Sequence, residues 1–215
     1  ASRQKCAVKI RLSRQQDMCV TGKRHPFENS YRVGFDEHGK ISAAKIEING
    51  NCGHSPDLSD AIVDRAMFHA DNAYFLNNCP IEGHRLKTHV VSHTAFRGFG
   101  GPQGMIMAEA MLDKIARATG QDPLNVRLLN LYGDAIENEE PHTNTTTPYG
   151  MEVQHNLLPE IMSQLAATGD YWSRREAIKV FNAGSPIIKK GLALTPVKFG
   201  ISFTAKHLNQ AGALV

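Results

Sequence analysis

The sequence has no long apolar run, no dense cluster of one charge and no signal-like start. No window of about 18 residues is continuously apolar, so no transmembrane helix is predicted. The first residues have no apolar stretch typical of a secretory signal. The net charge is only +3, and basic residues never occur in long runs, whereas nucleic-acid binding needs a concentrated basic stripe. We therefore expect a cytoplasmic protein that binds neither membranes nor nucleic acid.

Close cysteine pairs are also absent. The four cysteines are Cys6, Cys19, Cys52 and Cys79. This spacing predicts reduced thiols and offers no ligand pattern for an iron–sulfur cluster. Several histidines fall between residues 52 and 93, and His89 and His93 are four apart, but they lie in a strand-like segment that would not place them on one face. We expect no metal to be held directly by protein side chains here.

Alternating apolar and polar residues predict several strands. Residues 7–13 (AVKIRLS) show the pattern of a half-buried strand. Residues 30–48 predict a hairpin that turns at Gly39, with a phase change near Ala44 that indicates a β-bulge. Two further strands are expected within residues 85–92 and 189–204.

Helical periodicity is found in residues 57–74, 102–120, 123–132, 155–168 and 170–184. We expect Ser55 or Asp57 to cap the first of these helices. Its buried face would carry Ile62, Ala66 and His69. The elements are mixed without a βαβ rhythm, which predicts an α+β fold with a mixed sheet and packed helices.

The segment TAFRGFGGPQG, residues 94–104, is too rich in glycine for a helix or strand interior and too apolar for an ordinary surface loop. It lacks the third glycine of a dinucleotide fingerprint and the Lys-Ser/Thr of a P-loop, so a phosphate cradle is weakly supported. A tight packing loop is an equal alternative. Arg97, between Phe96 and Phe99, favours a planar or anionic ligand.

Two other features have simple structural explanations when taken alone. Arg65 follows Asp64 in a predicted helix and could form a surface salt bridge. The segment FGISFT, residues 199–204, could be a core strand in which Phe203 only packs.

Four segments taken together resemble the molybdenum-binding subunit of the xanthine dehydrogenase family. They are TGKRHPF (21–27), DRAMFHADNAY (64–74), THVVSHTAFRGFGGPQG (88–104) and KFGISFTAKHLNQAGAL (198–214). The resemblance covers nearly the whole chain in the family's order. It implies part of a molybdopterin-binding domain of the xanthine dehydrogenase/aldehyde oxidase type. Residues 1–137 would form a first cofactor-binding subdomain, and residues 138–215 a linker, two helices and the start of a second.

On the cofactor side, the resemblance implies that Phe96, Arg97 and Gly98 bind a molybdenum–molybdopterin group. Arg97 would lie beside the molybdenum without being a direct ligand. These implications remain to be compared with the geometry of the loop.

On the substrate side, the resemblance implies that Phe99 and Phe203 hold a flat purine between them. Arg65 would contact the purine and stabilise negative charge that develops during hydroxylation. Thr204 would hydrogen-bond a substrate oxygen, with the amide of Ala205 beside it.

The implied reaction is the oxidation of hypoxanthine and xanthine to urate. Electrons would pass through two 2Fe–2S clusters and FAD, bound outside this chain, to NAD or oxygen. The iron–sulfur and FAD parts would be domains or subunits of the same enzyme, with a dimer of the complete unit. We expect the chain to be an internal piece, since the family's FGGKE-type and GTEMGQG segments and its base glutamate are absent from it. Such a piece would not be active alone.

Two alternatives remain open. The first is an aldehyde oxidase-type molybdenum hydroxylase, although Arg65 and the GGPQ sequence favour a purine. The second is a non-catalytic subunit-interaction module, which has no need of an aromatic clamp at Phe99 and Phe203.

Overall fold

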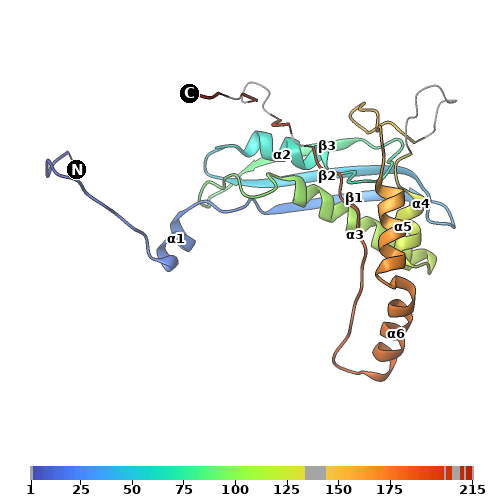
Figure 1. Ribbon diagram of the computed structural model, residues 1–215. Helices are drawn as coiled ribbons and strands as arrows, with labels where there is room; N and C mark the ends of the chain where they lie inside the picture. Colours follow the sequence, from blue (N-terminus) through green and yellow to red (C-terminus); the bar gives the residue numbers. More distant parts are fainter. Residues whose placement is uncertain (1, 134–143, 201, 205–208, 211, 215) are drawn as a thin grey trace.

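The computed structural model describes residues 2–133, 144–200, 202–204, 209–210 and 212–214. The helices are α1 (Arg14–Val20), α2 (Ser59–Phe68), α3 (Gly101–Thr119), α4 (Pro123–Leu129), α5 (Leu158–Thr168) and α6 (Tyr171–Gly184). The strands are β1 (Phe27–Phe35), β2 (Ile41–Gly53) and β3 (Ile81–Lys87). The strands form one sheet against which α2 and α3 pack, while α5 and α6 extend away from it (Figure 1). Within the described residues, no helix is both long and apolar enough to cross a membrane.

The predicted hairpin is confirmed. Strands β1 and β2 pair in antiparallel fashion, and Gly39 takes the left-handed conformation of the turn with φ 81°. The register shifts at the end of β1, where Phe35 pairs with Ile41, so that Ser42 is the extra residue of the predicted bulge. As a result Ala44 is buried in the core.

The predicted α+β fold is confirmed, although it contains one βαβ unit that the sequence patterns did not indicate. Strand β3 pairs in parallel with β2, and α2 forms the crossover between them. The sheet is nevertheless mixed, as predicted, because its order is β1-β2-β3 with one antiparallel and one parallel pairing. Strand β3 begins at Ile81 and leaves the sheet after Lys87, so the strand predicted within residues 85–92 is displaced.

Two predicted strands do not form in the described part of the chain. Val8 and Ile10 in residues 7–13 are 61% and 87% exposed and pair with no strand. Residues 14–20 form α1, which a capping box between Ser13 and Gln16 begins. The described part of residues 189–204 is irregular and runs back from the end of α6 to α2 (Figure 1). Alternation of apolar and polar residues indicates that a segment can form a strand, but it does not show whether a partner strand is available.

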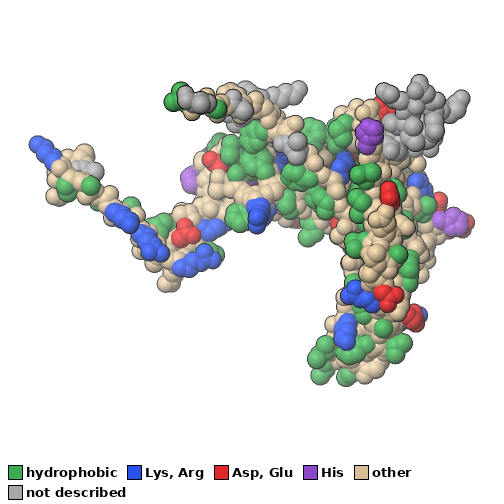
Figure 2. All heavy atoms as spheres, viewed as in Figure 1, with side chains coloured by type: hydrophobic (Ala, Val, Ile, Leu, Met, Phe, Trp, Pro, Cys, Tyr) green, Lys and Arg blue, Asp and Glu red, His purple; other side chains and the backbone are tan. Residues whose placement is uncertain are grey.

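The helix predictions are mostly confirmed. Helix α3 ends at Gly120, and α4 begins after Asp122, whose carboxylate accepts a hydrogen bond from the Leu124 amide at 2.9 Å. The predicted capping of α2 by Ser55 or Asp57 is wrong, because Leu58 precedes the helix and makes no side-chain cap. The remaining two predicted helices appear as α5 and α6, along which apolar side chains lie exposed (Figure 2).

Helices α2 and α3 meet backbone to backbone. A Cβ added at Gly100 would lie 2.0 Å from the carbonyl oxygen of Ile62, and one at Gly104 would lie 2.2 Å from that of Ala66. Two of the loop's glycines therefore serve close packing, which the sequence analysis left as the alternative to ligand binding. The resulting core joins residues of the sheet and both helices, including Ile46, Ile48, Ala66, Met111 and Leu112.

We predict that Gly104→Ala lowers the free energy of unfolding by about 1–3 kcal/mol, because the new methyl group would overlap the Ala66 carbonyl. Thermal unfolding of the full-length protein measures the effect. Gly184→Ala is the matched control, since Gly184 is also helical and has nothing within 4 Å of an added Cβ. Both substitutions gain helix propensity, so equal stability of the two variants would contradict the packing role of Gly104.

Candidate functional site

Arg65 lies on α2 and is buried, with 6% of its surface exposed. Its guanidinium donates hydrogen bonds to the carbonyl oxygens of Gly200, at 2.6 Å, and Ser202. The neighbouring Asp64 pairs with Arg85 instead. The interpretation of Arg65 as one half of a surface salt bridge is therefore wrong. Arg65 instead holds the C-terminal segment against α2. Burial lowers the pKa of the Arg65 guanidinium.

His69 follows Arg65 by one helical turn and is also buried. Its Nδ1 lies 2.8 Å from the carbonyl oxygen of Arg65, and its Nε2 accepts a hydrogen bond from the Gly200 amide at 3.0 Å. The Phe199 ring stacks obliquely on His69, with centroids 4.6 Å apart, and lies 5.4 Å from the Arg65 guanidinium. Phe199 occupies the space that the missing side chain of Gly101 leaves at the start of α3.

The turn after α2 fixes the same C-terminal segment at two more residues. The buried carboxylate of Asp71 accepts hydrogen bonds from Lys198 Nζ at 2.5 Å and from the Tyr132 hydroxyl at 2.6 Å. Asn72 donates to the Pro196 carbonyl at 3.0 Å and accepts from the Lys198 amide at 3.2 Å. Burial raises the pKa of Asp71, and the Lys198 ammonium opposes that shift. Side chains of α2 and its following turn thus hold the segment along its length.

The structure brings together the two phenylalanines that the sequence placed about a hundred residues apart. The ring centroids of Phe99 and Phe203 are 4.9 Å apart, with an angle of 52° between the rings. Rings in such direct contact leave no room for a purine between them, so binding would require them to separate. Thr204 lies beside them, with its hydroxyl donating to the Ala61 carbonyl at 2.9 Å. Ala205 lies outside the described residues.

The glycine loop has three successive residues in the left-handed conformation. Gly98, Phe99 and Gly100 have φ values of 92°, 52° and 99°. A left-handed phenylalanine is unusual, and here it turns the ring of Phe99 toward that of Phe203. Arg97 is exposed, and its guanidinium pairs with no described side chain.

Arg24 supports this loop from the segment before β1. Its Nη2 donates to the Arg97 carbonyl at 2.7 Å, and its guanidinium lies 4.6 Å from the Phe96 ring centroid. The Nη1 atom of Arg24 is buried without a hydrogen-bond partner. An orphaned donor and an unpaired Arg97 beside one loop fit an anionic group such as a molybdenum–pterin. No cluster of three or more His, Cys, Asp or Glu suited to a metal ion occurs among the described residues.

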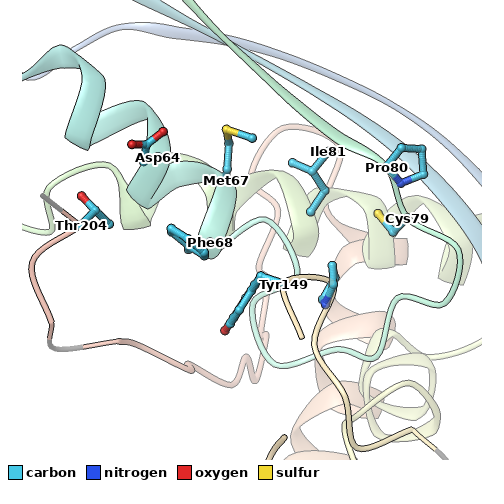
Figure 3. Close-up of a pocket in the computed structure, with 9 residues that line it drawn as sticks. Asp64, Met67, Phe68, Cys79, Pro80, Ile81, Tyr149 and Thr204 are labelled. Atoms are coloured by element: carbon cyan, nitrogen blue, oxygen red, sulfur yellow. The ribbon is translucent and has the colours of Figure 1, made fainter. Parts of the chain in front are cut away.

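A separate pocket of about 580 Å³ opens on another side of α2. Figure 3 shows Phe68 and Tyr149 projecting into it, and their rings meet edge to face at 5.1 Å. Burial raises the pKa of the Cys79 thiol in its wall to about 11. Among the predicted site residues only Thr204 lines this pocket, which offers packing surface but no group poised for catalysis.

Four residues that help to build the candidate site are not among the predicted site residues: Arg24, His69, Asp71 and Asn72. The resemblance segments TGKRHPF and DRAMFHADNAY contain all of them, but only Arg65 was given a role. For His69, Asp71 and Asn72 the signal is a run of polar residues directly after the apolar face of a helix, where buried polar groups require partners; no such pattern marks Arg24.

The sequence profile of the molybdopterin cofactor-binding domain family matches residues 1–131. The chain is 42% identical over 208 residues to a xanthine dehydrogenase of Dictyostelium discoideum, covering 97% of this chain and 15% of that protein. A xanthine dehydrogenase/oxidase of Gallus gallus is 41% identical over the same shares. The chain therefore spans only about 15% of the length of these relatives.

Solved structures show the same fold. An aldehyde oxidoreductase from Desulfovibrio desulfuricans superposes with a TM-score of 0.66 and 27% identity, over 78% of this chain and 17% of that one. A Cu,Mo-CO dehydrogenase superposes with a TM-score of 0.67 and 17% identity, over 80% of this chain and 22% of that one, which speaks for the fold alone. The sequence profile, the relatives and the fold agree, and the chain belongs to the molybdopterin cofactor-binding domain family.

Proposed function

We propose that this chain forms one wall of the active site of a molybdenum hydroxylase that oxidises hypoxanthine and xanthine to urate. The observation that carries the proposal is the convergence of a buried arginine, Arg65, and an aromatic pair, Phe99 and Phe203, on one C-terminal segment. The similarity to xanthine dehydrogenases over 97% of the chain supports it.

Each residue has a role that its chemistry suits. Phe99 and Phe203 present flat faces that bind a planar ring through apolar area and quadrupole geometry. Arg65 is always charged and sits in a dry environment, where a cation stabilises developing negative charge much more strongly than in water. Its Nε is buried without a partner, so one donor is unused by the fold. Thr204 can exchange its bond to Ala61 for one to a substrate oxygen.

The cofactor would lie on the other side of the glycine loop. When bound, the molybdenum cofactor supplies the oxygen transfer and takes up the electrons removed from the purine. Phe96, Arg97 and Gly98 would line its binding surface, with Arg97 beside the molybdenum but not bound to it. Arg24 would add a second positive charge there and hold the Arg97 backbone in place.

The rest of the enzyme would complete the reaction. The iron–sulfur clusters and FAD would be bound by other domains or subunits. Electrons would pass through them to NAD or oxygen, and the complete unit would form a dimer. The base glutamate would also come from outside this chain, which is then inactive alone. Within the chain we divide a first cofactor-binding subdomain, residues 1–137, from residues 138–215. The profile match to residues 1–131 supports that division.

A second candidate is an aldehyde oxidase-type hydroxylase, which the structural likeness to an aldehyde oxidoreductase favours. Arg65 favours the purine, because an uncharged aldehyde has no need of a buried cation.

A non-catalytic interaction module would keep the fold without the cofactor. The molybdenum content of the purified full-length protein separates this module from both enzymes, since only the module would lack the metal.

Arg65→Met in the molybdenum-loaded full-length enzyme should lower kcat/KM for xanthine by about 10²–10³-fold, the loss typical of one oxyanion-stabilising donor. Turnover of a small aldehyde should fall much less, since an aldehyde neither stacks between Phe99 and Phe203 nor needs charge stabilisation of a purine ring, although the variant also loses the Arg65 bonds to Gly200 and Ser202. Steady-state kinetics with both substrates provides the test. Undiminished xanthine turnover, or equal loss on both substrates, would refute the role of Arg65.

Phe99→Ala should raise KM for xanthine by about 10-fold, because one stacking face is worth roughly 1–3 kcal/mol. Phe181→Ala is the matched control, since Phe181 of α6 is partly exposed and packs against Lys190, and α6 extends away from the sheet and α2 (Figure 1). We expect the control to leave KM unchanged. A similar KM for xanthine in both variants would contradict the role of Phe99 in substrate binding.

A further inference from the structure

The hydrogen bonds of His69 specify the state of its ring. The Arg65 carbonyl can only accept, so Nδ1 of His69 must carry a proton. The Gly200 amide can only donate, so Nε2 must present its lone pair. Only the neutral imidazole protonated at Nδ1 satisfies both contacts.

These contacts close a ring of interactions around Gly200. His69 binds its amide at 3.0 Å, while Arg65 Nη1 binds its carbonyl oxygen at 2.6 Å. Arg65 in turn accepts from His69 through its own carbonyl. Arg65 in α2 and His69 at its C-terminal end thus fix both backbone polar groups of one residue.

Gly200 suits this position because a side chain would crowd the two groups that hold it. A Cβ there would lie 3.1 Å from Arg65 Nη1 and 3.9 Å from the His69 ring. Phe199, the residue before it, stacks on His69 with the ring centroids 4.6 Å apart. The ring contact and the two hydrogen bonds together hold Phe199 and Gly200 against the end of α2.

Phe203 and Thr204 follow Gly200 closely in an irregular segment. Such a segment has no ladder of its own, so its place is set by the contacts at its anchoring points. A displacement of Gly200 would therefore move the Phe203 ring relative to Phe99.

We propose that His69 is a positioning residue of the substrate site, which as a neutral ring protonated at Nδ1 holds Gly200 and thereby sets the places of Phe203, Thr204 and the Arg65 guanidinium. This inference rests on the proposed purine site. His69 itself touches neither the substrate nor the cofactor in this assignment.

The surroundings keep the ring neutral. Burial lowers the pKa of His69, and the positive charges of Arg65 from α2 and Lys198 from the C-terminal segment lower it further, against the bond to the Arg65 carbonyl. Protonation would place a second N–H against the Gly200 amide. The pKa of His69 in the folded protein therefore lies below its ordinary value of 6.5. The stability that the neutral His69 ring contributes is present above pH 6.5 and is lost as the pH falls through the lowered pKa.

Two amide variants in the molybdenum-loaded full-length enzyme separate the two bonds. In His69→Gln the side-chain oxygen reaches the place of Nε2 and can accept from Gly200. In His69→Asn the shorter side chain reaches only the place of Nδ1. We expect His69→Asn to raise KM for xanthine about 10-fold, the value of one buried hydrogen bond, and His69→Gln to stay within about 3-fold of wild type. Equal KM values in the two variants would overturn the proposal.

Crystal structures of both variants give a readout independent of activity. The Phe99–Phe203 centroid distance of 4.9 Å should persist in His69→Gln and change in His69→Asn. An unchanged Phe203 in His69→Asn would overturn the positioning role even if the enzyme acts on another substrate. If the wild type fails to oxidise xanthine, the proposed function fails, and these structures still decide the role of His69.

Thermal unfolding shows whether each variant is folded. Should His69→Asn not fold, His69→Gln decides alone. A xanthine KM within about 3-fold of wild type then supports the accepting role of Nε2, because glutamine restores only that bond. A rise above about 10-fold would overturn it.

Discussion

The candidate site depends on the hydrogen bonds that hold Gly200 against the end of α2. Arg65 and His69 together bind the amide and the carbonyl of this residue. Asp71 and Asn72 hold Lys198 and Pro196 just before Gly200, and Thr204 bonds to Ala61 of α2. Half of the aromatic pair and the Thr204 hydroxyl lie on this C-terminal segment, so the geometry of the substrate side depends on this set of contacts, with those of Arg65 and His69 at its centre.

The other half of the site depends on how closely α3 can approach α2. Gly100 and Gly104 let the two helices meet at their backbones, and this contact fixes the loop that carries Phe99. Helix α2 therefore contacts both the loop, through the Ile62 carbonyl at Gly100, and the C-terminal segment, through Arg65 and Ala61. Arg65 is buried without a carboxylate partner, and the backbone carbonyl oxygens of the C-terminal segment accept its hydrogen bonds instead. Its charge is solvated by peptide dipoles and remains available to an electron-rich ligand.

Local signals predicted much of this fold. The turn at Gly39, the end of α3 at Gly120 and the start of α4 after Asp122 depend on neighbouring residues, and all three are confirmed. The parallel pairing of β3 and the irregular course of residues 189–204 depend on distant partners, which the patterns could not show. Likewise the resemblance predicts site residues, but the contacts of Arg65 and His69 with Gly200 join residues more than 130 positions apart, which no local pattern can indicate.

The most direct test of this account is a crystal structure of the molybdenum-loaded full-length enzyme with a bound purine. We predict that the purine lies between Phe99 and Phe203, that Arg65 is within hydrogen-bonding distance of it, and that Gly200 still donates to His69. A purine bound elsewhere, with the two phenylalanine rings still in contact at 4.9 Å, would contradict the account.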